Sequence, residues 1–221
     1  MKIVAVVPVK LNNKRLPGKN IKQLSTGVPL CKHIFETLMH VDGIDEKYVY
    51  CSDEHIQQYM PNGMQYLKRS TDLDKDSTSM NQVLRAFAQD VDADVYVMTH
   101  TTAPFISSQS IEKGMDMVVN QDYDSAFSVK KLQDFLWKDG KPLNYTLDDI
   151  PRTQDLPVIY EETSGFYIYR KEVIQRLNRR IGERAYLVEV NGIEAIDIDE
   201  EDDFYIADAI SYFQNRRTEY E

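Results

Sequence analysis

The sequence predicts a three-layer α/β fold with a mainly parallel central sheet. Continuous apolar runs, such as residues 3–9 and 94–99, are typical of strands that are buried on both faces of a parallel sheet. Segments with apolar residues at helical spacing alternate with these runs as far as residue 120. We see no linker or internal repeat in the 221 residues, so we expect a single domain over residues 1–221.

The first half of the chain contains most of the regular pattern. Strands are expected at residues 3–9, 47–51, 66–68 and 94–99, and helices at 30–41, after Asp53, after the segment 76–79, and from Ser107 or Ser108 to Val119. Residues 10–29 are rich in asparagine, glycine and proline, and we expect them to form a long loop. This loop leaves the carboxyl end of the first strand, which is where ligands bind in such sheets.

The second half is less regular. Strands are expected at residues 125–129, 165–169, 186–190 and 195–199, followed by a helix over 202–213 and a polar tail over 214–221. Residues 131–162 are turn-rich and aromatic without a clear period, which is unusual inside a compact domain unless the segment binds something. We therefore expect residues 131–162 to be a dimerisation extension of a homodimer. The alternative is that this segment folds back on its own core.

Charge and composition exclude several classes of partner. The formal net charge is −10, which disfavours binding to nucleic acids and to anionic membranes because both are polyanions. No apolar run approaches the roughly 20 residues of a membrane span. Cys31 and Cys51 are the only cysteines, which favours a reducing, cytoplasmic location over a disulfide framework.

Positive charge is nevertheless concentrated in the first loop. Its cations are Lys10, Lys14, Arg15, Lys19 and Lys22, and no acidic residue precedes Glu36. The loop has neither the spacing of a Walker loop nor the three glycines of a dinucleotide fingerprint. Long cations around a turn that exposes backbone N–H groups suit a triphosphate, whereas the alternative is a solvated basic surface.

Asp197 and Asp199 form a candidate metal site. Alternating residues of a strand share one face, so both carboxylates would point the same way. Two such groups suit Mg²⁺, which is usually bound by one or two carboxylates together with substrate phosphates. The alternative is a solvated acidic turn before the last helix, where Asp202 and Asp203 would interact favourably with the helix dipole.

Residues 8–20 resemble the signature of the CMP-sugar-acid synthetases, the acylneuraminate cytidylyltransferase family, whose usual form is Arg-x-x-Ser-Lys-x-Leu/Ile-x-x-Lys-Asn. Lys10 stands at the usual arginine, Asn13 stands at the usual serine, and Lys14, Lys19 and Asn20 match directly. Further segments resemble the family in order and spacing: 52–53, 68–79, 100–104, 151–157 and 196–204. The resemblance covers essentially residues 3–210.

The resemblance implies a Rossmann-like nucleotidyltransferase fold and an enzyme that couples CTP to an acidic sugar. The sugar would be an N-acetylneuraminate-like 3-deoxy-2-ulosonic acid, and the products would be CMP-sugar and pyrophosphate. The implied nucleotide-binding residues are Lys10, Asn13, Lys14, Lys19, Asn20, Arg69, Asp76 and Ser79. The implied acceptor-binding residues are His100, Thr102, Arg152 and Gln154. The implied catalytic residues are Lys19, Asp197 and Asp199, and the two aspartates would hold Mg²⁺.

The chain departs from the family's pattern on the acceptor side. Members that use sialic acids usually carry a leucine and then an arginine after the proline that corresponds to Pro104. This chain has Phe105 and Ile106 there. Residues 161–165 are rich in carboxylates, which are poor partners for a sugar carboxylate. Either Arg152, in its own or the partner subunit, supplies the anion contact alone, or the acceptor is not sialic acid. A different acidic acceptor such as a phosphonate, and a non-catalytic nucleotide-binding protein, remain as alternatives.

Overall fold

The computed structural model describes residues 1–218, and its main feature is a seven-stranded sheet in the order β3-β2-β1-β4-β8-β5-β9. The strands are β1 (Ile3–Val9), β2 (Glu46–Cys51), β3 (Gln65–Lys68), β4 (Val95–Thr99), β5 (Ser125–Leu132), β8 (Ile159–Arg170) and β9 (Ala185–Glu189). Strand β8 is antiparallel to its neighbours β4 and β5, and all other neighbouring pairs are parallel. The predicted mainly parallel sheet is therefore confirmed.

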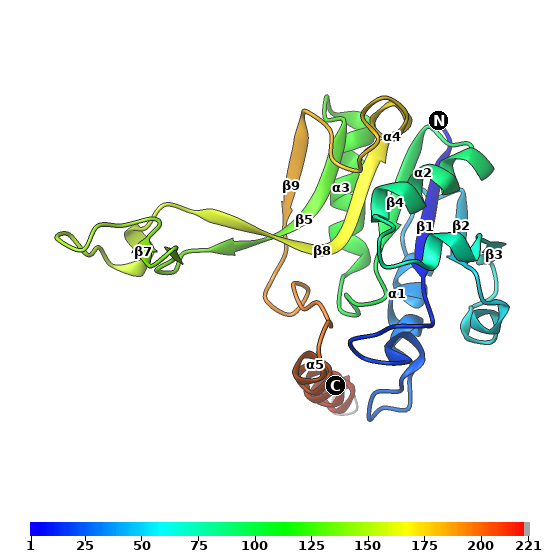
Figure 1. Cartoon of the computed structure of the whole chain (residues 1–221), viewed down its shortest axis with the longest axis horizontal. Helices are drawn as coiled ribbons and strands as arrows, with labels where there is room; N and C mark the ends of the chain where they lie inside the picture. Colours follow the sequence, from blue (N-terminus) through cyan, green and yellow to red (C-terminus); the bar gives the residue numbers. More distant parts are fainter. Residues whose placement is uncertain (219–221) are drawn as a thin grey trace.

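Helices cover both faces of the sheet, which gives the predicted three layers (Figure 1). They are α1 (Leu30–Met39), α2 (Met80–Asp90), α3 (Ser108–Asn120) and α4 (Lys171–Leu177), with short 3₁₀ turns at Lys19–Ile21, Glu54–Tyr59, Thr71–Asp74 and Thr153–Asp155. The last helix, α5 (Glu201–Thr218), lies beyond the end of the sheet and packs on the loop after β1 (Figure 1). Apolar side chains of α1 and α3 pack on one face of β1, and those of α2 and α4 pack on the other. All seven residues of β1 are buried for this reason, which explains its continuous apolar sequence.

Residues 195–199 do not form the expected strand. Residues 192–195 form a turn, and residues 196–199 belong to no strand or helix. The segment 196–199 is held by a hydrogen bond of 2.8 Å from the Ile198 N–H to the Thr102 carbonyl oxygen and by the buried Ile198 side chain. The last helix also differs from expectation, because α5 continues through Thr218 where a tail was expected, and residues 219–221 lie outside the described residues.

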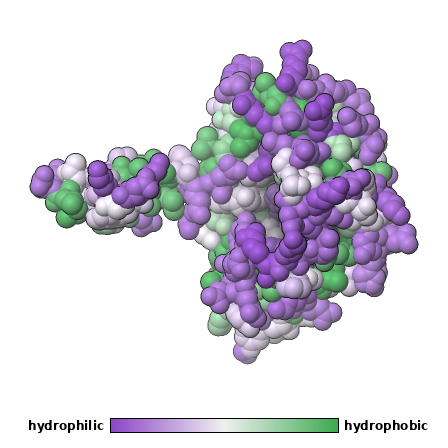
Figure 2. All heavy atoms as spheres, in the orientation of Figure 1, coloured by the Kyte–Doolittle hydropathy of each residue, from purple (hydrophilic) through white to green (hydrophobic). Residues whose placement is uncertain are grey.

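Residues 131–162 form an arm that projects from the body of the molecule (Figure 1). Strands β5 and β8 extend into its base, where Lys131 pairs with Tyr160, and a small hairpin of β6 (Trp137–Lys138) and β7 (Lys141–Pro142) lies further out. The arm is therefore more regular at its base than the sequence suggested, and it does not fold back on the core. Apolar residues line part of its surface (Figure 2). The exposed large ones include Phe135, Trp137, Leu143, Leu147, Ile150 and Val158.

Among the helices of residues 1–218, none combines the length and the apolar character that crossing a membrane requires.

Candidate nucleotide and acceptor site

The basic loop follows β1 and is fixed in place by Asn20. The Asn20 side-chain amide donates to the Lys10 carbonyl oxygen at 2.7 Å, and its oxygen accepts from the Thr101 hydroxyl at 2.8 Å. Asn20 thereby ties the start of the loop to the segment after β4. Its side chain is buried, so it shapes the predicted nucleotide site rather than offering a free donor to a ligand.

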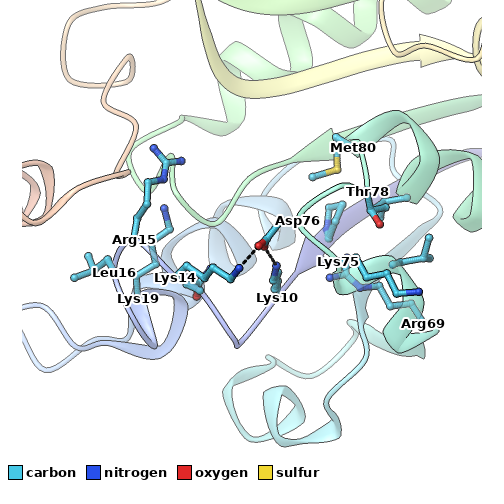
Figure 3. Close-up of a pocket in the computed structure, with 14 residues that line it drawn as sticks. Lys10, Lys14, Arg15, Leu16, Lys19, Arg69, Lys75, Asp76, Thr78 and Met80 are labelled. Atoms are coloured by element: carbon cyan, nitrogen blue, oxygen red, sulfur yellow. Dashed lines mark hydrogen bonds and ion pairs between the residues drawn. The ribbon is translucent and has the colours of Figure 1, made fainter.

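The loop forms one wall of a cavity of about 510 Å³. Lys10, Asn13, Lys14 and Lys19 line it from the loop, while Arg69 and Asp76 line it from the segment between β3 and α2. Figure 3 shows the two sets of side chains around Asp76. The structure therefore brings together six of the eight residues predicted to bind the nucleotide.

Asp76 pairs with two lysines of the loop. Its carboxylate accepts from the Lys10 ammonium at 3.2 Å and also from the Lys14 ammonium (Figure 3). Hydrogen bonds from Lys14 and Lys10 hold the pKa of Asp76 below its ordinary value. A triphosphate carries more negative charge than one carboxylate, so it would compete with Asp76 for both lysines.

Arg69 is held rigidly at the far side of this cavity. Its Nε and Nη2 atoms donate to one oxygen of Asp74 at 3.1 and 2.6 Å, and only 5% of Arg69 is exposed. Asp74 is itself hydrogen-bonded by the Ser52 hydroxyl. The guanidinium is thus preorganised by a carboxylate on the 3₁₀ turn that follows β3.

Ser79 lies outside the cavity that it was predicted to line. Its hydroxyl accepts from the Gln82 N–H at 3.3 Å, and the Gln82 side chain accepts from the Ser79 N–H at 2.7 Å, which makes a capping box at the start of α2. Thr78 lines the cavity instead. The Ser-x-x-Gln spacing before an apolar helical pattern was the sequence signal for this capping role.

A second cavity of about 330 Å³ adjoins the first, since Pro8, Lys10, Asn13, Lys19 and Met80 line both. Its other lining residues are Asn20, His100, Thr101, Thr102, Ser164, Arg180, Asp197 and Asp199. The structure thus places the predicted acceptor residues His100 and Thr102 beside the predicted metal ligands. It also adds Ser164 and Arg180, which we did not predict because no motif surrounds them.

Lys19, Arg15 and Asp199 form a charged cluster between the two cavities. The Lys19 ammonium donates to the Ile198 carbonyl oxygen at 2.6 Å and to Asp199 at 3.2 Å, and Arg15 donates to the same Asp199 oxygen at 2.7 Å. Burial alone would raise the pKa of Asp199, but the Lys19 and Arg15 contacts outweigh it and lower the pKa. Arg15 was not among the predicted site residues, although its position in the basic loop was a signal.

Asp197 is in the opposite situation. Its Oδ1 atom is buried and has no hydrogen-bond partner within residues 1–218. Burial raises the pKa of Asp197, the Thr102 hydroxyl opposes this shift, and the charge of Asp199 adds to it. A buried carboxylate oxygen without a partner is costly, and a cation would relieve that cost.

The pair therefore fits a divalent cation, although not through the strand geometry we expected. Both side chains line the second cavity, while Ile198 between them is buried among apolar residues of the basic loop and α5. Within the described chain, no group of three or more histidine, cysteine, aspartate or glutamate side chains is placed to hold a metal ion. The two carboxylates suit Mg²⁺ only if substrate phosphates complete its coordination.

His100 faces the second cavity in its neutral form. Burial and the nearby positive charge of Arg180 lower the pKa of His100 to about 4. Its ring lies edge-on to Tyr167, with ring centroids 6.3 Å apart. A neutral imidazole can donate one hydrogen bond and accept another, which suits a neutral polar group of an acceptor better than a carboxylate.

Arg152 and Gln154 lie elsewhere in the same chain. Both are exposed on the arm, where Arg152 pairs with Asp155 at 2.7 Å and the Gln154 carbonyl oxygen accepts from Gln133 at 3.2 Å. Neither residue lines the second cavity. The structure does not bring them to the second cavity of their own chain, because the arm projects away from the body (Figure 1). Their contact with the acceptor stays a prediction.

Two curated relatives extend over nearly the whole chain. An N-acylneuraminate cytidylyltransferase A of Danio rerio is 28% identical over 216 residues, covering 93% of this chain and 50% of that protein. An N-acylneuraminate cytidylyltransferase of Oncorhynchus mykiss is 29% identical over 216 residues, covering 93% and 49%. The chain thus spans about half the length of these relatives.

A solved structure and a family model agree with these relatives. The structure of a CMP:2-keto-3-deoxy-manno-octonic acid synthetase complexed with CTP has a TM-score of 0.73 at 18% identity, covering 97% of this chain and 100% of that one. This likeness confirms the Rossmann-like nucleotidyltransferase fold. The family model described as Cytidylyltransferase matches residues 4–216. The chain therefore belongs to the cytidylyltransferase family.

Proposed function

We propose that this protein couples CTP to an acidic sugar, giving a CMP-sugar and pyrophosphate. The observation that carries the proposal is the adjacency of two cavities that share Lys10, Asn13 and Lys19. One cavity is lined by the cationic loop, and the other contains the Asp197 and Asp199 pair. A nucleotide in the first and an acceptor in the second would meet at the shared residues.

Each part of the site has a distinct role in this reaction. Lys10, Lys14 and Lys19 bind the triphosphate, and Arg69 faces the base or the ribose. The acceptor hydroxyl attacks the α-phosphorus in line and loses its proton to solvent. Its new P–O bond forms as the bond from the α-phosphorus to the bridging β-phosphate oxygen breaks, and pyrophosphate leaves with the electron pair. The lysines oppose the negative charge that develops on the leaving group.

Asp197 and Asp199 are the residues that would hold Mg²⁺. The partnerless Asp197 oxygen supports this assignment more strongly than Asp199 does, because Lys19 and Arg15 already contact Asp199. When bound, the cation supplies charge stabilisation to the phosphate oxygens. Lys19 then positions Asp199 and joins the nucleotide loop to the acidic segment.

The arm is proposed to complete the site in a homodimer. Its exposed apolar side chains favour burial against a second copy, and a closed two-fold dimer is the commonest assembly. In such a dimer, Arg152 of one subunit contacts the acceptor in the other subunit's second cavity. This arrangement accounts for the distance of Arg152 from the site in its own chain.

Pyrophosphate release tests the proposed reaction. The purified chain is assayed with Mg²⁺ and each of the four nucleoside triphosphates, against N-acetylneuraminate, 2-keto-3-deoxy-manno-octonate and an acidic phosphonate. We expect release only with CTP and only in the presence of a sugar acid. Release with the phosphonate alone would favour the alternative acceptor. CTP binding without release from any acceptor would favour a non-catalytic nucleotide-binding protein.

A further inference from the structure

Arg180 reaches the second cavity from the segment between α4 and β9. Its guanidinium carbon lies 4.1 Å from the centroid of the Tyr167 ring. Its Nη2 atom donates to the Tyr167 hydroxyl at 3.2 Å and to Glu162 at 3.4 Å. The stacked ring and the two acceptors on one nitrogen fix both the plane and the direction of the guanidinium.

The guanidinium of Arg180 still has donor capacity beside Nη2. The Nε atom of Arg180 is buried and finds no hydrogen-bond partner in the described part of the chain. A buried N–H without a partner is costly, and an anionic oxygen is a strong acceptor for the charge-assisted hydrogen bond that this Nε can still donate. A residue in this state at the wall of a cavity points to an anionic ligand.

The other cations near this cavity are already engaged. Lys10 is paired with Asp76, and Lys19 donates to Asp199 and to a backbone carbonyl. Arg152 is on the arm and is paired with Asp155. Arg180 is also paired, with Glu162 at 3.4 Å, but its buried Nε has no partner within the described residues. This free donor makes Arg180 the cation best placed within one chain to take a second negative group beside the triphosphate.

We propose that Arg180 binds the carboxylate of the acceptor, an inference that rests on the proposed function. In a 2-ulosonic acid, the carboxylate is bonded to the carbon that carries the attacking hydroxyl. Fixing the carboxylate on Arg180 therefore fixes the position of the reacting oxygen beside Asp197 and the shared lysines. Glu162 and Tyr167 act as positioning residues that orient the guanidinium. The acceptor class follows as a sugar acid whose carboxylate adjoins the reacting carbon.

Steady-state kinetics of Arg180→Met and Arg180→Lys test this assignment, with N-acetylneuraminate and 2-keto-3-deoxy-manno-octonate as acceptors. For Arg180→Met, we expect the acceptor KM to rise roughly 10- to 100-fold while the CTP KM stays within about twofold. Arg180→Lys keeps the charge but loses the planar set of donors. Its acceptor KM should therefore lie between those of the unsubstituted chain and Arg180→Met. Arg184→Met is the matched control, because Arg184 is 59% exposed and paired with Asp122.

A neutral acceptor separates carboxylate binding from a merely structural role. The methyl ester of each sugar acid should be a far poorer acceptor than the acid for the unsubstituted chain, whereas Arg180→Met should scarcely distinguish the two. Equal losses with acid and ester would contradict the assignment, as would an unchanged acceptor KM in a folded Arg180→Met. If the unsubstituted chain releases no pyrophosphate with either acid, the proposed function itself fails.

Discussion

At the scale of single residues, the two aspartates of the acidic segment differ in what stabilises them. Asp199 is contacted by Lys19 and Arg15, which lower its pKa despite partial burial. Asp197 has one buried oxygen without a partner in the described chain, and burial raises its pKa. Asp197 therefore destabilises the folded protein when ionised, whereas Asp199 stabilises it.

Amide substitutions should separate these two effects. Asp197→Asn removes an uncompensated buried charge, so we expect the Tm to rise by about 2–4 °C, which corresponds to about 1 kcal/mol. Asp199→Asn removes the partner of a nearly buried Lys19, so its Tm should fall by a similar amount. Both variants should lose turnover on the order of 100-fold. Thermal melting at pH 7 checks the Tm changes, and pyrophosphate release checks the loss of turnover. A lower Tm for Asp197→Asn would contradict an uncompensated buried charge at Asp197.

The sequence alone predicted the cavity-lining residues that cluster along the chain. It missed those that only the folding of the chain brings to a cavity. The lysines of the loop were visible because several cations fall together after a buried strand. Arg180 follows a short helix with no motif around it, and only the folding of the chain brings it to Tyr167 and the second cavity. Ser79 caps α2, and its contact with the nucleotide stays a prediction, since a helix cap and a ligand contact favour the same residue type.

At the scale of elements, Glu194 connects α3 to the segment that carries the two aspartates. One of its oxygens accepts from the Ser107 N–H, at the N-cap of α3, at 3.0 Å, and from the Ser107 and Ser110 hydroxyls. The other accepts from the Asn191 side chain at 2.8 Å. Burial alone would raise the pKa of Glu194, but these hydrogen bonds outweigh it and lower the pKa.

This arrangement predicts an acid-sensitive contribution to stability. The folded-state pKa of Glu194 lies below its unfolded value of about 4.5, so its stabilisation is present above that value and is lost as the pH falls through the lowered pKa. Glu194→Gln should lower the Tm at pH 7 by about 4–8 °C, which corresponds to about 2 kcal/mol. Below pH 4, the difference in Tm between the two proteins should shrink. A constant difference across this range would argue against the ionised Glu194.

The predictability of an element followed its burial. The apolar runs at 3–9 and 94–99 became strands within one residue of their expected bounds, because packing on both faces imposes the pattern. The strand expected at residues 195–199 is absent, because this segment pairs with no neighbouring strand, which the local sequence does not reveal. Strand β8 begins earlier than expected, since its first residues are held by pairing with β5. These residues are largely exposed, so their sequence shows no burial pattern that would predict a strand.

At the scale of the whole molecule, the arm carries large apolar side chains that the described part of the same chain leaves exposed. Trp137 is 55% exposed on the arm, and Tyr205 is 60% exposed on α5. If the arm forms the dimer interface, Trp137→Ala should raise the dimer dissociation constant roughly 30-fold, whereas Tyr205→Ala should leave it unchanged. Sedimentation checks this against the 25.7 kDa mass of one chain. A monomer at micromolar concentration would refute the homodimer.

Mixed dimers test whether the arm serves the partner's site. A preparation of Arg152→Ala is combined with one of Asp199→Ala, each of which should have little activity alone. If Arg152 acts across the interface, one site of each mixed dimer contains neither substitution and activity returns. Subunit exchange is followed separately with fluorescent labels. Complete exchange without recovery would place the function of Arg152 in its own subunit or outside the site.

In the proposed reaction one nucleotidyl group passes from CTP to a sugar acid, and identifying the products is a direct test of this transfer. The chain is incubated with CTP, Mg²⁺ and either N-acetylneuraminate or 2-keto-3-deoxy-manno-octonate. The products are then separated and identified by mass spectrometry. We expect a CMP-sugar and pyrophosphate in equal amounts, with neither formed by a folded Asp199→Ala. Intact CTP, or CTP hydrolysed without transfer to either sugar acid, would contradict the proposed reaction.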